Sequence, residues 1–231
     1  MDKPTDHVLV VFCHPKEDSF GARLLAEYTA GLTASGRTFE VADLYREQFA
    51  PVFEAGDYVQ FDEGGIMPLS IRQQQARIVR ADAITIISPL WWLGFPAMLK
   101  GWFDRVWSCG WAYEYANDPD GSLLPLRPYL LLMTTGGSAS NFARNGYASA
   151  LDSVIRVGVT GWCGVSESSL VLMHDTGMSE TTARSHLEFV RSTSRLSGAS
   201  TAVSHDPSII TILDTPVQAR NRPAIRSAAD A

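Results

Sequence analysis

Five short strand-like segments alternate with segments of helical periodicity along this chain of 231 residues. Most of the five are continuous apolar runs, which is typical of strands buried on both faces of a parallel sheet. The predicted strands are residues 7–12, 38–42, 83–88, 129–135 and 169–173. The predicted helices are residues 20–35, 69–81, 95–107, 148–159 and 179–196. This alternation predicts a three-layer α/β/α fold around a five-stranded parallel sheet.

A doubly wound sheet of this kind favours the strand order 2-1-3-4-5, and its ligands bind beyond the carboxyl ends of the strands. Three segments that follow strands should therefore converge on one site, namely residues 13–20, 89–95 and 134–147. We expect residues 1–197 to form the domain. Residues 198–231 are small, polar and interrupted by proline, so we expect them to form a tail that is mobile or draped over a partner.

Charge and cysteine content exclude several classes of protein. The formal net charge is −6, which argues against nucleic acid as a partner. The three cysteines are widely spaced and form no CxxC pair, so we expect neither a zinc site nor a disulfide framework. No apolar stretch is long enough to span a membrane, and the first residues do not have the layout of a signal peptide. These features predict a protein of the reducing cytoplasm with no bound metal.

The first converging segment carries His14 and Ser19 just before a predicted helix. The start of a helix offers free N–H groups and a positive dipole end, which suit a phosphate group. The alternative is that Ser19 only caps the helix and His14 is solvated. The segment contains neither a P-loop nor a GxGxxG motif, so a dinucleotide bound in the Rossmann manner is not expected.

The second segment, PLWWLGFP, places Trp91 and Trp92 side by side at the end of a strand. Both side chains cannot easily face inward, and a flat conjugated ligand would explain them. The alternative, compatible with the first, is an oligomer interface, where tryptophan is enriched.

The third segment, Thr134-Thr-Gly-Gly-Ser138, follows the fourth predicted strand. Two glycines let bare backbone N–H groups approach a ligand closely, and such groups can stabilise negative charge that develops on a ring. A plain turn would have a similar sequence, so the prediction depends on the position of this segment at the expected site.

These segments resemble those of one known family. HPKEDSF, PLWWLGFPAMLKGWFDRV, WAYEY and TTGGS are similar to segments of the NAD(P)H:quinone oxidoreductases, flavodoxin-like flavoproteins of the DT-diaphorase kind, and the likeness spans roughly residues 7–195. The resemblance implies a homodimer that holds FAD, or FMN as in some relatives, at the subunit interface, and FAD is the expected cofactor here. It also implies two-electron transfer from the co-substrate NAD(P)H through the flavin to a quinone-like acceptor, by a ping-pong route.

The resemblance also implies roles for individual residues. The phosphate and ribityl part of the flavin would be held by His14, Ser19, Phe20 and Gly21, where the last replaces the asparagine of the family. The isoalloxazine ring would be lined by Pro89, Leu90, Trp91, Trp92 and Leu93, and its polar edge would be bonded by Thr134, Thr135, Gly136 and Gly137. Arg184 matches an arginine near the adenine half. Tyr113 and Tyr115 match aromatic residues that cover the substrate from the partner subunit.

One departure from the family concerns proton transfer. Relatives carry a tyrosine and, six residues later, a histidine after TTGGS, whereas this chain has Phe142 and Ala148. Neither side chain can donate a proton, so we assign Phe142 to the substrate pocket and Tyr147 to both substrate binding and the catalytic proton. The acceptor is then a quinone or another conjugated molecule, such as an enone, an azo compound or a nitro compound. We expect a structural or solvated role for His174.

A second function remains open at this point. A non-catalytic flavodoxin-fold regulatory or partner subunit could retain a flavin pocket and bind another protein. The intact aromatic segment favours the enzyme, whereas the polar tail and the missing Tyr/His pair favour the regulator.

Overall fold

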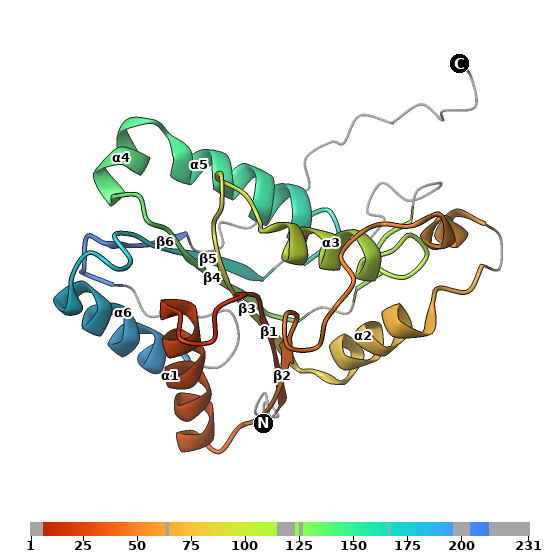
Figure 1. Ribbon diagram of the computed structural model, residues 1–231, viewed down its shortest axis with the longest axis horizontal. Helices are drawn as coiled ribbons and strands as arrows, with labels where there is room; N and C mark the ends of the chain where they lie inside the picture. The colour runs from red at the N-terminus through yellow and green to blue at the C-terminus, as the bar shows by residue number, and fades with distance from the viewer. Residues whose placement is uncertain are drawn as a thin grey trace.

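The computed structural model describes residues 7–62, 65–114, 123–124, 127–165, 167–195 and 204–212. The described residues form a three-layer α/β/α domain around one twisted sheet (Figure 1). The strands are β1 (His7–Phe12), β2 (Thr38–Asp43), β3 (Ala83–Pro89), β4 (Tyr129–Thr134), β5 (Ser168–Met173) and β6 (Ile209–Ile212). The helices are α1 (Phe20–Ala34), α2 (Leu69–Arg80), α3 (Ala97–Val106), α4 (Ala139–Arg144), α5 (Tyr147–Leu151) and α6 (Glu180–Thr193), with a 3₁₀ helix η1 (Ala55–Phe61) and a π-helix η2 (Asp152–Thr160).

The sheet has the order β2-β1-β3-β4-β5-β6, with β1 to β5 parallel, as predicted. Alternate residues of β1 enter opposite cores, because successive strand side chains point to opposite faces. Val8, Val10 and Phe12 join the core under α1 and α6. Leu9 and Val11 join the core under α2, α3 and η2. Burial on both faces explains the unbroken apolar run at residues 8–12 of β1.

The prediction of five strands is wrong, because β6 adds a sixth that runs antiparallel to β5. Ile209 pairs with Met173, and Ile212 pairs with Leu170. This strand lies inside the stretch 198–231 that we expected to be a tail. It covers the edge that β5 would otherwise expose, since unpaired edge groups need a partner. A run of four residues after a proline was too short to stand out from its polar surroundings.

Helix boundaries agree closely with the prediction except around residues 139–160. Ser19 and Ser179 cap α1 and α6 by accepting hydrogen bonds from the amides of Ala22 and Thr182. The predicted helix 148–159 begins one residue earlier as α5 and continues as the π-helix η2. Within the described parts of the chain, no helix has both the length and the apolar character needed to cross a membrane.

Candidate active site at the carboxyl ends of the strands

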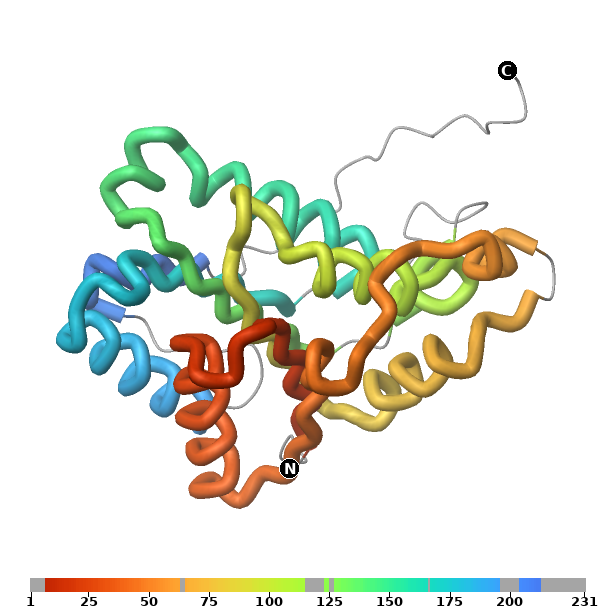
Figure 2. Tube along the Cα trace, viewed as in Figure 1, coloured from red at the N-terminus to blue at the C-terminus, as the bar shows by residue number. Residues whose placement is uncertain are grey.

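The three predicted segments leave the sheet at the same edge. Because β1, β3 and β4 are adjacent and parallel, their carboxyl ends lie together. Figure 2 shows the red segment after β1, the yellow segment after β3 and the green segment after β4 at that edge. The Leu90 amide donates to the Thr134 carbonyl at 2.8 Å, and the rings of His14 and Trp91 lie 6.5 Å apart. The sequence therefore located this convergence correctly.

The segment after β1 combines a helix cap with free donors. The Ser19 hydroxyl accepts from the Ala22 amide at 3.1 Å, whereas the amides of Phe20 and Gly21 have no partner among the described residues. His14 Nδ1 lies 3.0 Å from the Lys16 amide nitrogen and 3.2 Å from the Lys16 carbonyl oxygen, so it bonds within its own loop, whereas Nε2 has no partner among the described residues. Capping and anion binding are thus compatible here, because the cap occupies one amide and leaves two.

The segment after β3 is a tight turn with an unusual backbone. Trp91 and Gly94 exchange two backbone hydrogen bonds of 3.1 Å, and Trp92 and Leu93 between them have φ angles of 55° and 57°. Non-glycine residues in this left-handed region store roughly 1–3 kcal/mol of strain each. Trp92 is fully exposed at 102%, and Trp91 is exposed at 44%. The turn therefore presents flat aromatic surface that no described residue covers.

The glycines after β4 differ in their surroundings. A Cβ on Gly136 would meet no heavy atom within 4 Å, so the space beside it is open. A Cβ on Gly137 would lie 2.9 Å from the Phe142 ring, so packing inside the protein already requires glycine there. The space beside the Cα is therefore open at Gly136 and filled by the Phe142 ring at Gly137.

The remaining predicted residues occupy different parts of this region. Phe142 is 4% exposed and its ring packs 5.6 Å from that of half-buried Tyr147. Tyr113 is half-buried in the loop after α3, and Tyr115 lies outside the described residues. Arg184 is exposed on α6, close enough to Glu180 for its charge to lower the pKa of that carboxyl, although hydrogen bonding and charge from Arg23 contribute more.

His174 follows β5 directly, and its sequence context predicted only a structural or solvated role. It is completely buried, and its Nδ1 lies 3.5 Å from the Thr135 hydroxyl oxygen. Its ring packs against Phe142 at 4.4 Å. The available signal was a histidine at the carboxyl end of the last parallel strand. A local pattern could not show that Thr135, 39 residues earlier, would be its neighbour.

Burial lowers the pKa of both His174 and His186, and the carboxylates of Asp175 and Asp206 only partly oppose this. In the unfolded chain both imidazoles titrate near their ordinary pKa of 6.5, so below that pH the unfolded state binds more protons than the folded state. We therefore expect the free energy of unfolding to fall as the pH is lowered from about 7 to about 5. Urea unfolding across this range measures it. A free energy of unfolding that stays constant or rises as the pH falls would contradict neutral, buried histidines. The lowered pKa of Asp206 changes the free energy of unfolding only below this pH range.

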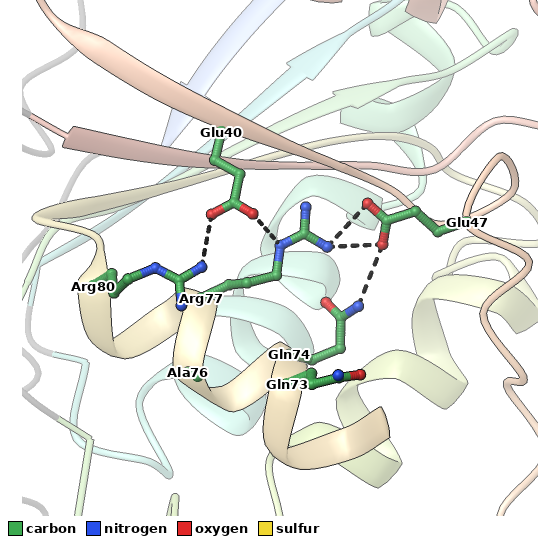
Figure 3. A pocket seen from close by; sticks show the side chains of 7 residues that line it. All are labelled: Glu40, Glu47, Gln73, Gln74, Ala76, Arg77 and Arg80. Atoms are coloured by element: carbon green, nitrogen blue, oxygen red, sulfur yellow. Dashed lines mark hydrogen bonds and ion pairs between the residues drawn. The ribbon is translucent and has the colours of Figure 1, made fainter. Parts of the chain in front are cut away.

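A shallow polar depression of about 500 Å³ lies on the surface between α2 and the β2 region (Figure 3). The Arg77 guanidinium pairs with Glu40 at 2.9 Å and with Glu47 at 2.7 Å, and Arg80 also pairs with Glu40. The charged groups that line the depression neutralise one another. We therefore assign this network to the attachment of α2 to β2 rather than to ligand binding.

Comparison with known proteins agrees with this geometry. The flavodoxin-like fold family matches residues 6–193. An uncharacterized NAD(P)H oxidoreductase of Haemophilus influenzae is 32% identical over 177 residues, which cover 76% of this chain and 87% of the relative. NAD(P)H dehydrogenase [quinone] 1 of Rattus norvegicus is 29% identical over 196 residues, covering 76% of this chain and 71% of the relative.

A solved structure supports the same assignment. The NAD(P)H:quinone oxidoreductase from Methanothermobacter marburgensis superposes with a TM-score of 0.77 at 31% identity, covering 83% of this chain and 98% of that one. The fold, the converging segments and these relatives agree with the resemblance seen in the sequence. The chain belongs to the flavodoxin-fold family of NAD(P)H:quinone oxidoreductases.

Proposed function

We propose that this protein is a flavin-dependent NAD(P)H oxidoreductase that reduces quinone-like or other conjugated small molecules. One observation carries the proposal: free helix amides, an exposed aromatic turn and an open glycine lie at one edge of the sheet. Relatives named NAD(P)H dehydrogenase [quinone] and NAD(P)H:quinone oxidoreductase support it. The ping-pong order, in which NAD(P)H and acceptor use the same space in turn, is part of the proposal.

The residues present fit a flavin. The amides of Phe20 and Gly21, with His14 Nε2 and the Ser19 hydroxyl, would hold a phosphate group. Residues 89–93 would line the ring, and Thr134 to Gly137 would bond its polar edge, with the open space at Gly136 nearest to it. We propose FAD, with Arg184 on the adenine side. When bound, the flavin supplies the two-electron hydride chemistry, and the protein positions the reactants and excludes water.

The chain offers few groups to handle the proton that accompanies reduction of the acceptor. Phe142 is apolar and packed beneath the Gly137 backbone, and Ala148 has no polar atom. The Tyr147 phenol, at the start of α5, is our candidate donor. Tyr113 and Tyr115 would cover the acceptor from a partner subunit.

We also propose that the protein is a homodimer of the reducing cytoplasm. Large apolar side chains are exposed on the turn after β3, on η1 and at or just before the start of α2: Trp92, Leu93, Tyr58, Phe61, Ile66 and Leu69. A monomer rarely leaves so much apolar surface in water, so a second copy is a natural cover. Cys13, Cys109 and Cys163 form no disulfide within the described residues, which suits a reducing compartment. Light scattering should give twice the 25.3 kDa of one chain.

Absorption spectroscopy tests the central proposal. The purified protein should be yellow, should bleach with NADH or NADPH without oxygen, and should regain colour when a quinone is added. Chromatography of the released cofactor distinguishes FAD from FMN. A protein that binds neither FMN nor FAD would overturn the proposal. A protein that binds flavin but is reduced by neither nucleotide would favour the non-catalytic subunit, which the absence of the Tyr/His pair supports.

Replacing Gly136 with valine should weaken flavin binding at least tenfold while the free energy of unfolding of the flavin-free protein changes little. The new side chain enters open space, so it clashes only with a bound ring. Fluorescence titration with FMN and FAD measures the affinity. Gly56→Val is the matched control, because its Cβ also meets nothing within 4 Å but lies on η1. Equal affinity in Gly136→Val and wild type would remove Gly136 from the site.

Replacing Tyr147 with phenylalanine should slow reoxidation of the reduced protein by quinone by a factor of about 10²–10⁴, the usual contribution of a positioned acid. Flavin affinity should stay the same, because the phenol is assigned to the acceptor. Stopped-flow absorbance after mixing with a quinone measures this half-reaction. Wild-type rates in the variant would discard Tyr147 as the donor.

A further inference from the structure

Residues 204–212 lie beyond the part of the chain that the flavodoxin-like family matches, which ends at residue 193. We call them the strap. The strap includes β6, which extends the sheet beside β5, and a short approach segment that carries Asp206 and Ser208. It packs against two completely buried histidines, His174 after β5 and His186 on α6.

Ser208 connects the strap to both histidines. Its carbonyl accepts from the His174 backbone amide at 2.8 Å. Its hydroxyl donates to Asp206 Oδ1 at 2.6 Å and therefore accepts from His186 Nε2 at 2.8 Å. Asp206 is held in turn by the amide of Ser208 and by the hydroxyl of Ser185. The strap thus fixes one histidine through its backbone and the other through a hydroxyl.

His174 lies between the strap and the loop after β4, and it contacts both. Its Nδ1 reaches the Thr135 hydroxyl oxygen at 3.5 Å, and that hydroxyl bridges the amide and the carbonyl of Gly137 at 3.0 and 3.1 Å. Asp175 and Thr176, the two residues after His174, also bond to this loop. The Asp175 amide donates to the Gly137 carbonyl at 3.2 Å, and the Thr176 hydroxyl donates to the Thr135 carbonyl at 2.9 Å.

His186 lies between the strap and the start of α1, and it contacts both. Its ring lies 5.9 Å from that of Phe20, the first residue of α1 and one of the two residues whose amides have no partner among the described residues. The strap therefore lies behind two of the three segments that converge at the site, at positions 135–137 and 20. Both histidines also have one buried ring nitrogen without a partner among the described residues, so their other nitrogen supplies their orientation.

We propose that the strap positions the flavin-holding loops, with His174 setting Thr135 to Gly137 and His186 setting the start of α1. This inference rests on the proposed function, because it assigns those loops to the flavin. His174 and His186 are positioning residues in this scheme, since neither contacts the ligand. The strap would be an addition of this chain to the part of the fold that the family shares.

The test removes one hydroxyl from the strap. Ser208→Ala breaks the contacts with His186 and Asp206 while the pairing of β6 with β5 stays in place. Thr211→Val is the matched control, because Thr211 lies on β6 and its buried hydroxyl has no partner among the described residues. Ser208→Thr restores a hydroxyl and should rescue the effect. Each full-length variant is studied first without flavin, by hydrogen exchange, and then by fluorescence titration with FMN and FAD.

The Ser208 carbonyl still holds His174 in Ser208→Ala, so the change should appear on the His186 side. We expect Ser208→Ala to raise amide exchange at Ala22 and Arg23, at the start of α1, at least fivefold without raising it in α2, and to weaken flavin binding at least fivefold. Thr211→Val and Ser208→Thr should stay within twofold of wild type. Unchanged exchange at those amides, or an equal rise throughout the domain, would overturn the positioning role. If wild type binds neither FMN nor FAD, the proposed function fails, while the exchange of the flavin-free protein still decides whether the strap sets the loops.

Discussion

Replacing Asp57 with alanine is expected to lower the free energy of unfolding by about 3–5 kcal/mol, because it leaves a buried arginine without its charge partner. Asp57 on η1 is completely buried, and its two carboxylate oxygens accept from Arg105 Nε at 2.9 Å and Nη2 at 3.1 Å. The carboxylate also accepts from the Glu54 amide at 2.8 Å, and Arg105 Nη1 donates to the Ala50 carbonyl at 2.6 Å. Urea unfolding followed by circular dichroism measures the change.

The matched control is Asp104→Ala on α3, the helix that carries Arg105. Asp104 pairs with Lys100 at 2.5 Å, but both side chains are largely in water, so the loss should stay below about 1 kcal/mol. Similar losses in the two variants would mean that the Asp57–Arg105 pair does not anchor η1 to α3. Because η1 carries exposed Tyr58 and Phe61, loss of this anchor should also weaken the proposed dimer.

Replacing Gly101 with alanine is expected to destabilise the protein, although helix propensity alone would favour alanine by about 1 kcal/mol. The new Cβ would lie 2.0 Å from the Pro51 carbonyl oxygen and 2.6 Å from the carbonyl carbon. Backbone cannot rotate away as a side chain can, so α3 or residues 50–52 must shift. Overpacking of this kind costs about 1–3 kcal/mol, and urea unfolding measures the net loss.

Gly31→Ala in α1 is the comparison for this variant. There the nearest atom to the new Cβ is the Ser194 hydroxyl oxygen, which a side-chain rotation moves away, while the nearest backbone atom lies at 3.1 Å. The loss should be clearly smaller than at Gly101. A Gly101→Ala variant as stable as wild type would show that α3 and residues 50–52 do not pack as closely as the structure describes.

The sequence predicted the parallel strands, the helix caps and the meeting of three loops, because those signals are local. A strand buried on both faces is largely apolar, and residues 8–12 are apolar at every position. A serine before a helix can cap it within three residues, as Ser19 does. Once the strands are parallel, the carboxyl ends of neighbouring strands must meet, and no contact between side chains is needed to infer it.

Contacts between distant residues could not be inferred in this way. Asp57 and Arg105 are 48 positions apart, and each alone is typical of a solvated charge. The sequence pointed to Gly136 and Gly137 alike. Only the fold showed that the Phe142 ring packs beside Gly137 and that the space beside Gly136 is open. His174 became relevant only when β5 ended beside Thr135 and the strap closed over it.

The sequence by itself determined the order of the parallel strands and the edge of the sheet at which the loops after them lie. The tertiary structure decided which side chains support those loops. The physical reason is range: periodicity and capping depend on neighbours along the chain, whereas burial of a charge or of an imidazole depends on atoms that only folding brings near.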